Sequence, residues 1–128
     1  MESNASLRFL IVDDNEAIRM ILTDLLVELG HQVVGEAEDL DSAVSAYEKH
    51  KPDLVTLDLS LSAIGGGDGL SVLKALRLRD AAAKVIVVSG NSQRKVCEQL
   101  EKEGAVAFVP KPIKGKDLTE AIAWATRG

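Results

Sequence analysis

Several short apolar runs of the sequence end in polar side chains that could carry out chemistry together. The first run ends at a pair of carboxylates, a later run at a third carboxylate, another at a hydroxyl, and the last at a lysine between two prolines. These residues are Asp13, Asp14, Asp58, Ser89 and Lys111. Clustered carboxylates raise one another's pKa unless a cation or an ammonium compensates their charge. Oxygen ligands without His or Cys favour Mg²⁺, and Mn²⁺ is an alternative.

A divalent cation, an ammonium and a hydroxyl around carboxylates would form a site suited to phosphoryl transfer. The cation and the ammonium would stabilise the charge of the transferred group, and a carboxylate can act as the nucleophile to give an aspartyl phosphate. Each residue alone also has an ordinary structural interpretation, as a helix cap, a turn residue or a surface lysine. The functional interpretation depends on all of them meeting at one place.

Short apolar runs alternate along the chain with longer segments of helical period. The runs of strand type are Leu7–Val12, Gln32–Ala37, Leu54–Leu59, Lys84–Ser89 and Ala105–Val109. The helical segments are Asn15–Leu29, a segment from Asp39 or Asp41 to about His50, Gly69–Arg79, Asn91–Gly104 and Lys114–Thr126. Strands that alternate with helices predict a parallel sheet covered on both faces.

This alternation predicts an α/β fold of the flavodoxin-like (βα)5 class, a three-layer sandwich with a parallel sheet of strand order 2-1-3-4-5. The first, third and fourth runs are almost continuously apolar, as expected of strands buried on both faces. In such a sheet, ligands bind at the carboxyl ends of the strands, near the switch in strand order. The polar residues named above follow these strand ends, so the predicted fold brings them to one edge.

Apolar residues at helical spacing predict which side of the first and last helices is buried. In the first helix these residues are Ile18, Ile21, Leu22, Leu25 and Leu29. In the last helix they are Leu118, Ile122 and Trp124. We expect both helices to turn these residues toward the sheet.

Length and composition limit the classes of protein that fit this chain. Its 128 residues predict a single domain, 1–128, with a core over about 7–126. The net charge of −5 and the absence of a basic patch argue against direct nucleic-acid binding. No apolar run reaches the roughly 20 residues of a membrane-spanning helix, and the N-terminus lacks a signal-peptide pattern. We therefore expect no membrane insertion and a cytoplasmic location, and the single cysteine, Cys97, excludes an internal disulfide.

Four sequence motifs together resemble the CheY-like receiver domains of response regulators in two-component signalling systems. They are IVDDN at Ile11–Asn15, LVTLDLSL at Leu54–Leu61, VIVVSGN at Val85–Asn91 and GAVAFVPKPI at Gly104–Ile113. Each motif is weak alone, but their order and spacing are specific. The resemblance extends from about Leu7 to Thr126.

The resemblance implies a role for each site residue. Asp58 would be the phosphoacceptor, assisted by Lys111 and Ser89. Mg²⁺ would be held by Asp14, Asp58 and the backbone carbonyl of Ser60, with Asp13 acting mainly through metal-bound water. Two further roles concern the response to phosphorylation and its lifetime. Ser89 and Phe108 would form the switch, and Ser60 and Asn91 occupy positions that tune dephosphorylation in the family.

The resemblance also implies partners and the extent of the chemistry. A sensor histidine kinase or a phosphotransfer protein would supply the phosphoryl group. A downstream protein would bind the face formed by the fourth helix, the fifth strand and the fifth helix. The chain would catalyse only its own phosphotransfer and dephosphorylation and would not be a metabolic enzyme. Because the sequence ends soon after the last helix, we expect either a stand-alone regulator that acts by protein contact or part of a longer one.

One segment departs from the family pattern. Many receivers have a Met-Pro pair after the phosphoacceptor, whereas this chain has a glycine-rich stretch, Gly65–Gly69, in which Asp68 could cap the next helix.

Three other functions stay open as alternatives. A flavin-binding protein of this fold would want neutral phosphate-binding groups where Asp13 and Asp14 stand. A metal-dependent phosphatase or hydrolase would usually place an acid where Ser60 stands. A pseudo-receiver that only docks would not need so complete a site.

Overall fold

The computed structural model describes residues 6–59, 69–90 and 94–127, with side chains for all of these except 94–97. Strands and helices alternate through the described residues, as the apolar pattern predicts. The strands are β1 (Arg8–Val12), β2 (Gln32–Ala37), β3 (Leu54–Asp58), β4 (Val85–Ser89) and β5 (Ala105–Pro110). The helices are α1 (Glu16–Glu28), α2 (Leu40–His50), α3 (Gly69–Arg79), α4 (Arg94–Lys102) and α5 (Gly115–Ala125).

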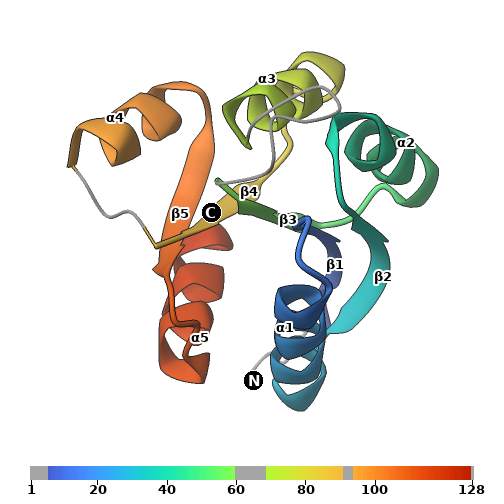
Figure 1. Ribbon diagram of the computed structural model, residues 1–128, viewed down its shortest axis with the longest axis vertical. Coiled ribbons are helices and arrows are strands. Elements are labelled where there is room, and N and C mark those ends of the chain that lie inside the picture. The colour runs from blue at the N-terminus through green and yellow to red at the C-terminus, as the bar shows by residue number, and fades with distance from the viewer. Residues whose placement is uncertain (1–5, 60–68, 91–93, 128) are drawn as a thin grey trace.

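The strands form one parallel sheet in the order β2-β1-β3-β4-β5, which confirms the predicted flavodoxin-like fold. Figure 1 shows the three layers: α2, α3 and α4 lie on one side of the sheet, and α1 and α5 lie on the other. The chain reverses its direction of travel across the sheet after β2, so β1 and β3 are neighbours. Their carboxyl ends flank the point at which such sheets bind ligands.

Side chains of the central strands point alternately into two separate cores. Leu10, Val55 and Val87 pack on the side of α2 and α3. Phe9 and Ile86 pack on the side of α1 and α5. Since each central strand has a core on both faces, its apolar run is continuous, and this continuity made the strands recognisable in the sequence.

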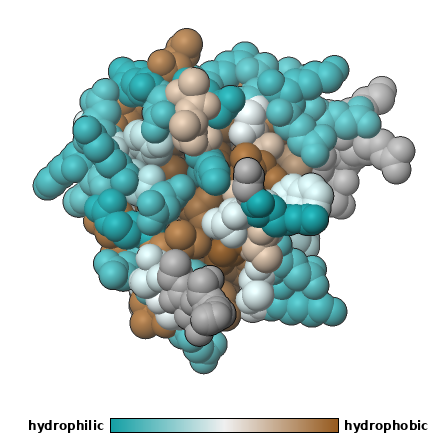
Figure 2. Space-filling view, turned by 180° about the vertical axis from the view of Figure 1, so that it is seen from behind, coloured by the Kyte–Doolittle hydropathy of each residue, from teal (hydrophilic) through white to brown (hydrophobic). Residues whose placement is uncertain are grey.

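The prediction of the buried helix faces was wrong at three positions. Ile21, Leu29 and Trp124 are 46%, 38% and 61% exposed. In α5 the buried residues are spaced i, i+3, i+4 and i+7 from Leu118 through Ala125, and this stripe excludes Trp124. Figure 2 shows hydrophobic residues among the hydrophilic ones on the face that it draws.

Side-chain caps fix the starts of α1 and α2. Asn15 caps α1, because its Oδ1 accepts hydrogen bonds from the backbone N–H groups of Ala17 and Ile18 at 2.8 and 3.2 Å. Asp39, and not Asp41, caps α2 by accepting from the N–H of Ser42 at 2.8 Å. Since Asn15 satisfies the end of α1, the preceding aspartates are not needed as caps.

No helix among the described residues is both long enough and apolar enough to cross a lipid bilayer.

Gly69 holds the start of α3 against the chain that follows Asp58. A Cβ atom at Gly69 would lie 2.7 Å from the Cα of Leu59 and 2.9 Å from the carbonyl oxygen of Asp58. Both neighbours are backbone atoms, so they cannot move aside as a flexible side chain could. The close approach of α3 to the end of β3 therefore requires glycine here.

Gly69→Ala is expected to destabilise the fold by about 1–3 kcal/mol, the usual cost of forcing an extra carbon into a packed site. Ala is otherwise favoured over Gly inside a helix, so a loss of stability would isolate the steric contact. Urea unfolding measures the change. Gly90→Ala is the control, since a Cβ there meets nothing within 4 Å, and an equal effect of both substitutions would contradict the steric explanation.

Candidate functional site

Three carboxylates meet at the carboxyl edge of β1 and β3. Asp13 and Asp14 follow β1, and Asp58 is the last residue of β3. Each offers an oxygen that lies within 4.8 Å of the corresponding oxygens of the other two. Asp13 and Asp58 are 1% and 3% exposed, whereas Asp14 is open to solvent. The cluster is therefore buried at Asp13 and Asp58 and open to solvent at Asp14.

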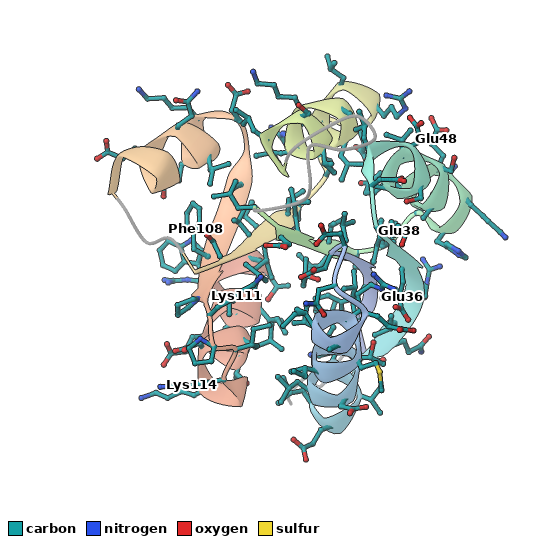
Figure 3. The ribbon with its side chains drawn as sticks, in the orientation of Figure 1. Glu36, Glu38, Glu48, Phe108, Lys111 and Lys114 are labelled. Atoms are coloured by element: carbon teal, nitrogen blue, oxygen red, sulfur yellow. The ribbon has the colours of Figure 1, made fainter. Side chains whose placement is uncertain are left out.

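Lys111 supplies the positive charge beside this cluster. It follows β5, and its Nζ lies 3.1 Å from Oδ1 of Asp58 as a charged hydrogen bond. Figure 3 shows the labelled Lys111 side chain extending from the end of β5 toward the middle of the sheet. The backbone N–H of Lys111 donates to the carbonyl of Ser89 at 3.0 Å, which fixes the start of this side chain relative to β4.

Asp13 is the carboxylate of the cluster whose negative charge is opposed by burial. Its Oδ1 accepts a hydrogen bond from the backbone N–H of Asn15 at 2.8 Å, but its buried Oδ2 has no hydrogen-bond partner among the described residues. Burial raises the pKa of Asp13 from 3.8 to about 6. The bond from Asn15 and the charge of Lys111 oppose this rise, and the nearby charges of Asp58 and Asp14 add to it.

The donor set fits a hard divalent cation. The three side chains that meet here all offer carboxylate oxygens, the class of ligand that Mg²⁺ and Mn²⁺ prefer. The unpartnered Oδ2 of Asp13 is a buried polar atom that a cation would satisfy directly or through water. One lysine faces three carboxylates, so a divalent cation would also balance the remaining charge. Asp13, Asp14 and Asp58 are the residues that could hold it.

The remaining predicted site residues divide into those the structure places and those outside its description. Ser89 ends β4 at the same edge and is half-buried. Phe108 lies on β5 and is partly buried against the core on the α2, α3 and α4 side. Ser60 and Asn91 lie outside the described residues, as does Asp68.

Arg19 is a residue near the site that the sequence interpretation missed. Its guanidinium donates from Nη1 to the backbone carbonyl of Asp13 at 2.6 Å and from Nε to Oε1 of Glu36 on β2 at 2.9 Å. Arg19 thereby ties the turn that carries Asp13 to both α1 and β2. Its sequence signal was its place one turn after the Asn15 cap, among the inward-facing residues of α1.

Arg19→Lys is expected to weaken Mg²⁺ binding by about tenfold, the order seen when a group that orients a metal ligand is lost. An ammonium cannot donate to both acceptors with the geometry of a guanidinium. Isothermal titration calorimetry with MgCl₂ measures the affinity. Arg8→Lys is the matched control, because Arg8 donates to the carbonyls of His50 and Lys51 at 2.7 and 2.9 Å, at the opposite end of β1 from Asp13 and Asp14. Equal weakening by both variants would exclude a positioning role for Arg19.

Asp13→Asn is expected to raise the free energy of unfolding of the metal-free protein at neutral pH. Between pH 3.8 and about 6 the folded chain keeps the Asp13 proton that the unfolded chain has lost, so stability falls as pH rises through this window. An Asn side chain does not titrate, so the variant does not lose this stability as pH rises. The difference in the pKa of Asp13 between the folded and the unfolded chain corresponds to about 2–3 kcal/mol.

Urea unfolding without metal should show a gain for Asp13→Asn of about 2 kcal/mol at neutral pH and a much smaller gain near pH 4. Asp24→Asn, on the exposed side of α1, is the control for removing one negative charge. A gain for Asp13→Asn that does not change with pH would show that burial of the charge is not its source.

Comparison with known proteins agrees with this geometry. The sequence matches the model of the response regulator receiver domain over residues 9–123. It is 39% identical to the chemotaxis protein CheY of Bacillus subtilis over 115 residues, which cover 90% of this chain and 93% of that protein. It is also 39% identical to the transcriptional regulatory protein PdtaR of Mycobacterium tuberculosis over 118 residues, covering 92% of this chain and 56% of that protein.

Solved structures show the same relationship. CheY of Borrelia burgdorferi, in a complex with CheX, BeF₃ and Mg²⁺, superposes with a TM-score of 0.85 at 27% identity, covering 91% of this chain and 87% of that one. The response regulator domain of Thermotoga maritima CheB superposes with a TM-score of 0.84 at 30% identity, covering 97% and 98%. The chain belongs to the CheY-like response regulator receiver domains of two-component signalling.

Proposed function

We propose that this receiver domain accepts a phosphoryl group on Asp58 from a histidine kinase or a phosphotransfer protein and so acts as a signalling switch. The observation that carries the proposal is the environment of Asp58. Its carboxylate is buried, lies 3.1 Å from the ammonium of Lys111 and shares an edge with Asp13 and Asp14. A buried carboxylate that lies beside an ammonium, at an edge that could hold a cation, is suited to act as a nucleophile toward phosphorus.

The transfer conserves atoms and electrons without another reactant. An oxygen of the Asp58 carboxylate forms a bond to phosphorus while the bond from phosphorus to the donor's histidine nitrogen breaks, and that nitrogen keeps the electron pair. The product is an acyl phosphate on Asp58. Attack of water on phosphorus then returns the carboxylate and inorganic phosphate. The chain would catalyse only these two steps and would not turn over other substrates.

The residues around Asp58 would divide the remaining work. Lys111 would pair with an oxygen of the transferred group, because its ammonium already lies 3.1 Å from Oδ1 of Asp58. Asp13, Asp14 and Asp58 would hold Mg²⁺, with the backbone carbonyl of Ser60 as a further ligand by resemblance. When bound, Mg²⁺ would neutralise charge on the phosphoryl oxygens. Arg19 would keep the Asp13 turn in place.

The structural change that follows phosphorylation of Asp58 would spread from Ser89 and Lys111 along β4 and β5. The Ser89 hydroxyl would donate a hydrogen bond to the phosphoryl group, and Phe108 would move toward the space that Ser89 leaves. Phe108 lies on β5, three residues before Lys111, which follows this strand, and Phe108 pairs with Val87 of β4. A change at the acyl phosphate would thus alter the face formed by α4, β5 and α5, where a downstream protein would bind. We expect these events in the cytoplasm.

Incubation with Mg²⁺ and acetyl phosphate is expected to add one phosphoryl group to the wild-type chain, and Asp58→Asn should abolish the addition. Intact-mass spectrometry measures it, and peptide mapping after borohydride reduction locates it. Asp24→Asn, at an exposed position of α1, should be phosphorylated like the wild type. Addition of the phosphoryl group in Asp58→Asn, or its absence from the wild type with Mg²⁺ present, would contradict the proposal.

A further inference from the structure

A groove with an acidic rim lies along the outer edge of β5, between α4 and α5. Its volume is about 350 Å³. Val106, Phe108 and Trp124 contribute apolar surface to it, and three carboxylates surround them, from Glu101, Asp117 and Glu120. The described residues that line the groove include no lysine or arginine.

The groove is open because β5 is an edge strand. Among the described residues, β5 pairs only with β4, and no further strand covers its other side. Figure 1 shows α4 and α5 on opposite sides of the sheet at this edge, and Figure 3 shows the labelled Phe108 on β5 between them. The side chains of Val106 and Phe108 are therefore only partly buried, as the alternating burial along β5 records.

Trp124 is an exposed aromatic side chain in the lining of this groove. It is 61% exposed, although a large aromatic side chain usually lies in a core or an interface. The guanidinium of Arg127 lies over the Trp124 ring, 4.8 Å from its centroid. The ring face thus already attracts a positive charge from within the chain.

We propose that this groove binds a partner protein segment in which Lys or Arg flanks an apolar side chain. The volume admits one or two side chains, which would contact Val106, Phe108 and Trp124. The flanking cations would meet Glu101, Asp117 and Glu120, and opposite charges at an interface favour both encounter and specificity. The inference rests on the proposed function, in which this face receives the downstream partner, and adds the chemistry of that partner.

Other occupants fit the groove less well. A second copy of the chain that used the same surface would bring like carboxylates together, since a two-fold interface places the same patch on both sides. Nucleic acid is repelled by an acidic rim, because its binding depends on neutralising phosphates with Lys and Arg. Charge therefore favours a basic protein segment over either alternative.

Trp124 is the only tryptophan of the chain, so its fluorescence reports directly on the groove. The probe is a synthetic peptide of Lys and Leu residues that lacks aromatic side chains, titrated into the beryllofluoride–Mg²⁺ form of the full chain at low salt. We expect a saturable change in Trp124 emission. A matched peptide with Glu in place of Lys should cause none, and an equal response to both peptides would overturn the proposal.

Glu101→Gln combined with Glu120→Gln is expected to weaken binding of the basic peptide by about fivefold, as estimated from two exposed charge pairs. Asp24→Asn combined with Glu28→Gln removes the same charge from the exposed side of α1 and should change the affinity by less than about twofold. Equal weakening by the two double variants would show general attraction to an acidic protein and would overturn the assignment to the groove.

The same protein samples separate this inference from the proposed function. Phosphorylation of Asp58 by acetyl phosphate does not involve Glu101 or Glu120, so the groove variant should accept the phosphoryl group like the wild type. Normal phosphorylation without peptide binding would overturn the inference alone. Peptide binding at the groove without phosphorylation of Asp58 in any form would overturn the proposed function while supporting the basic chemistry of the partner.

Discussion

The crowding of three carboxylates at one edge of the sheet is the constraint on which the rest of this structure depends. Like charges this close repel, and two of the carboxylates, those of Asp13 and Asp58, are removed from water. Lys111 offsets part of the charge at 3.1 Å from Asp58. The arrangement is nevertheless short of positive charge, and it keeps one buried oxygen of Asp13 without a partner among the described residues. Such an arrangement is better suited to holding a cation than to stabilising the fold.

The surrounding fold holds this unfavourable cluster together by contacts that do not involve it directly. Arg19 ties the backbone of Asp13 to Glu36 on β2, and Asn15 takes over the capping of α1. Gly69 lets α3 begin directly against the backbone of Asp58 and Leu59. Two buried cores, one on each face of the sheet, stabilise the fold and offset the unfavourable free energy of the carboxylate cluster.

The sequence was informative where a short pattern decides the structure. The strands and their order followed from apolar runs and chain connectivity, because strands with a core on both faces need continuous apolar sequence. The meeting of Asp13, Asp14, Asp58 and Lys111 followed from the geometry of parallel strands, whose carboxyl ends share one edge.

The features that were missed depend on contacts between distant segments. The place of Arg19 among the inward-facing residues of α1 is only a weak sequence signal, and its partner Glu36 is brought beside it by β2, a distant segment. The helical spacing of apolar residues predicts that Trp124 is buried, but the stripe that α5 buries is set by how the helix lies across the sheet. Helical period alone fixes the spacing of a buried stripe and not its exact rotation.

The position of β5 links the chemistry of the site to events at the outer edge of the sheet. Lys111 directly follows this strand, and Phe108 and Val106 on it line the groove. Suppose that a partner binds one arrangement of β5 more tightly than another, and that Lys111 moves with this strand. Binding of the partner then favours one arrangement of Lys111, and that arrangement favours the partner by the same free energy. Occupancy of the outer edge would then shift the balance between the arrangements of Lys111 beside Asp58, so that the edge of the sheet and the carboxylate cluster would influence each other in both directions.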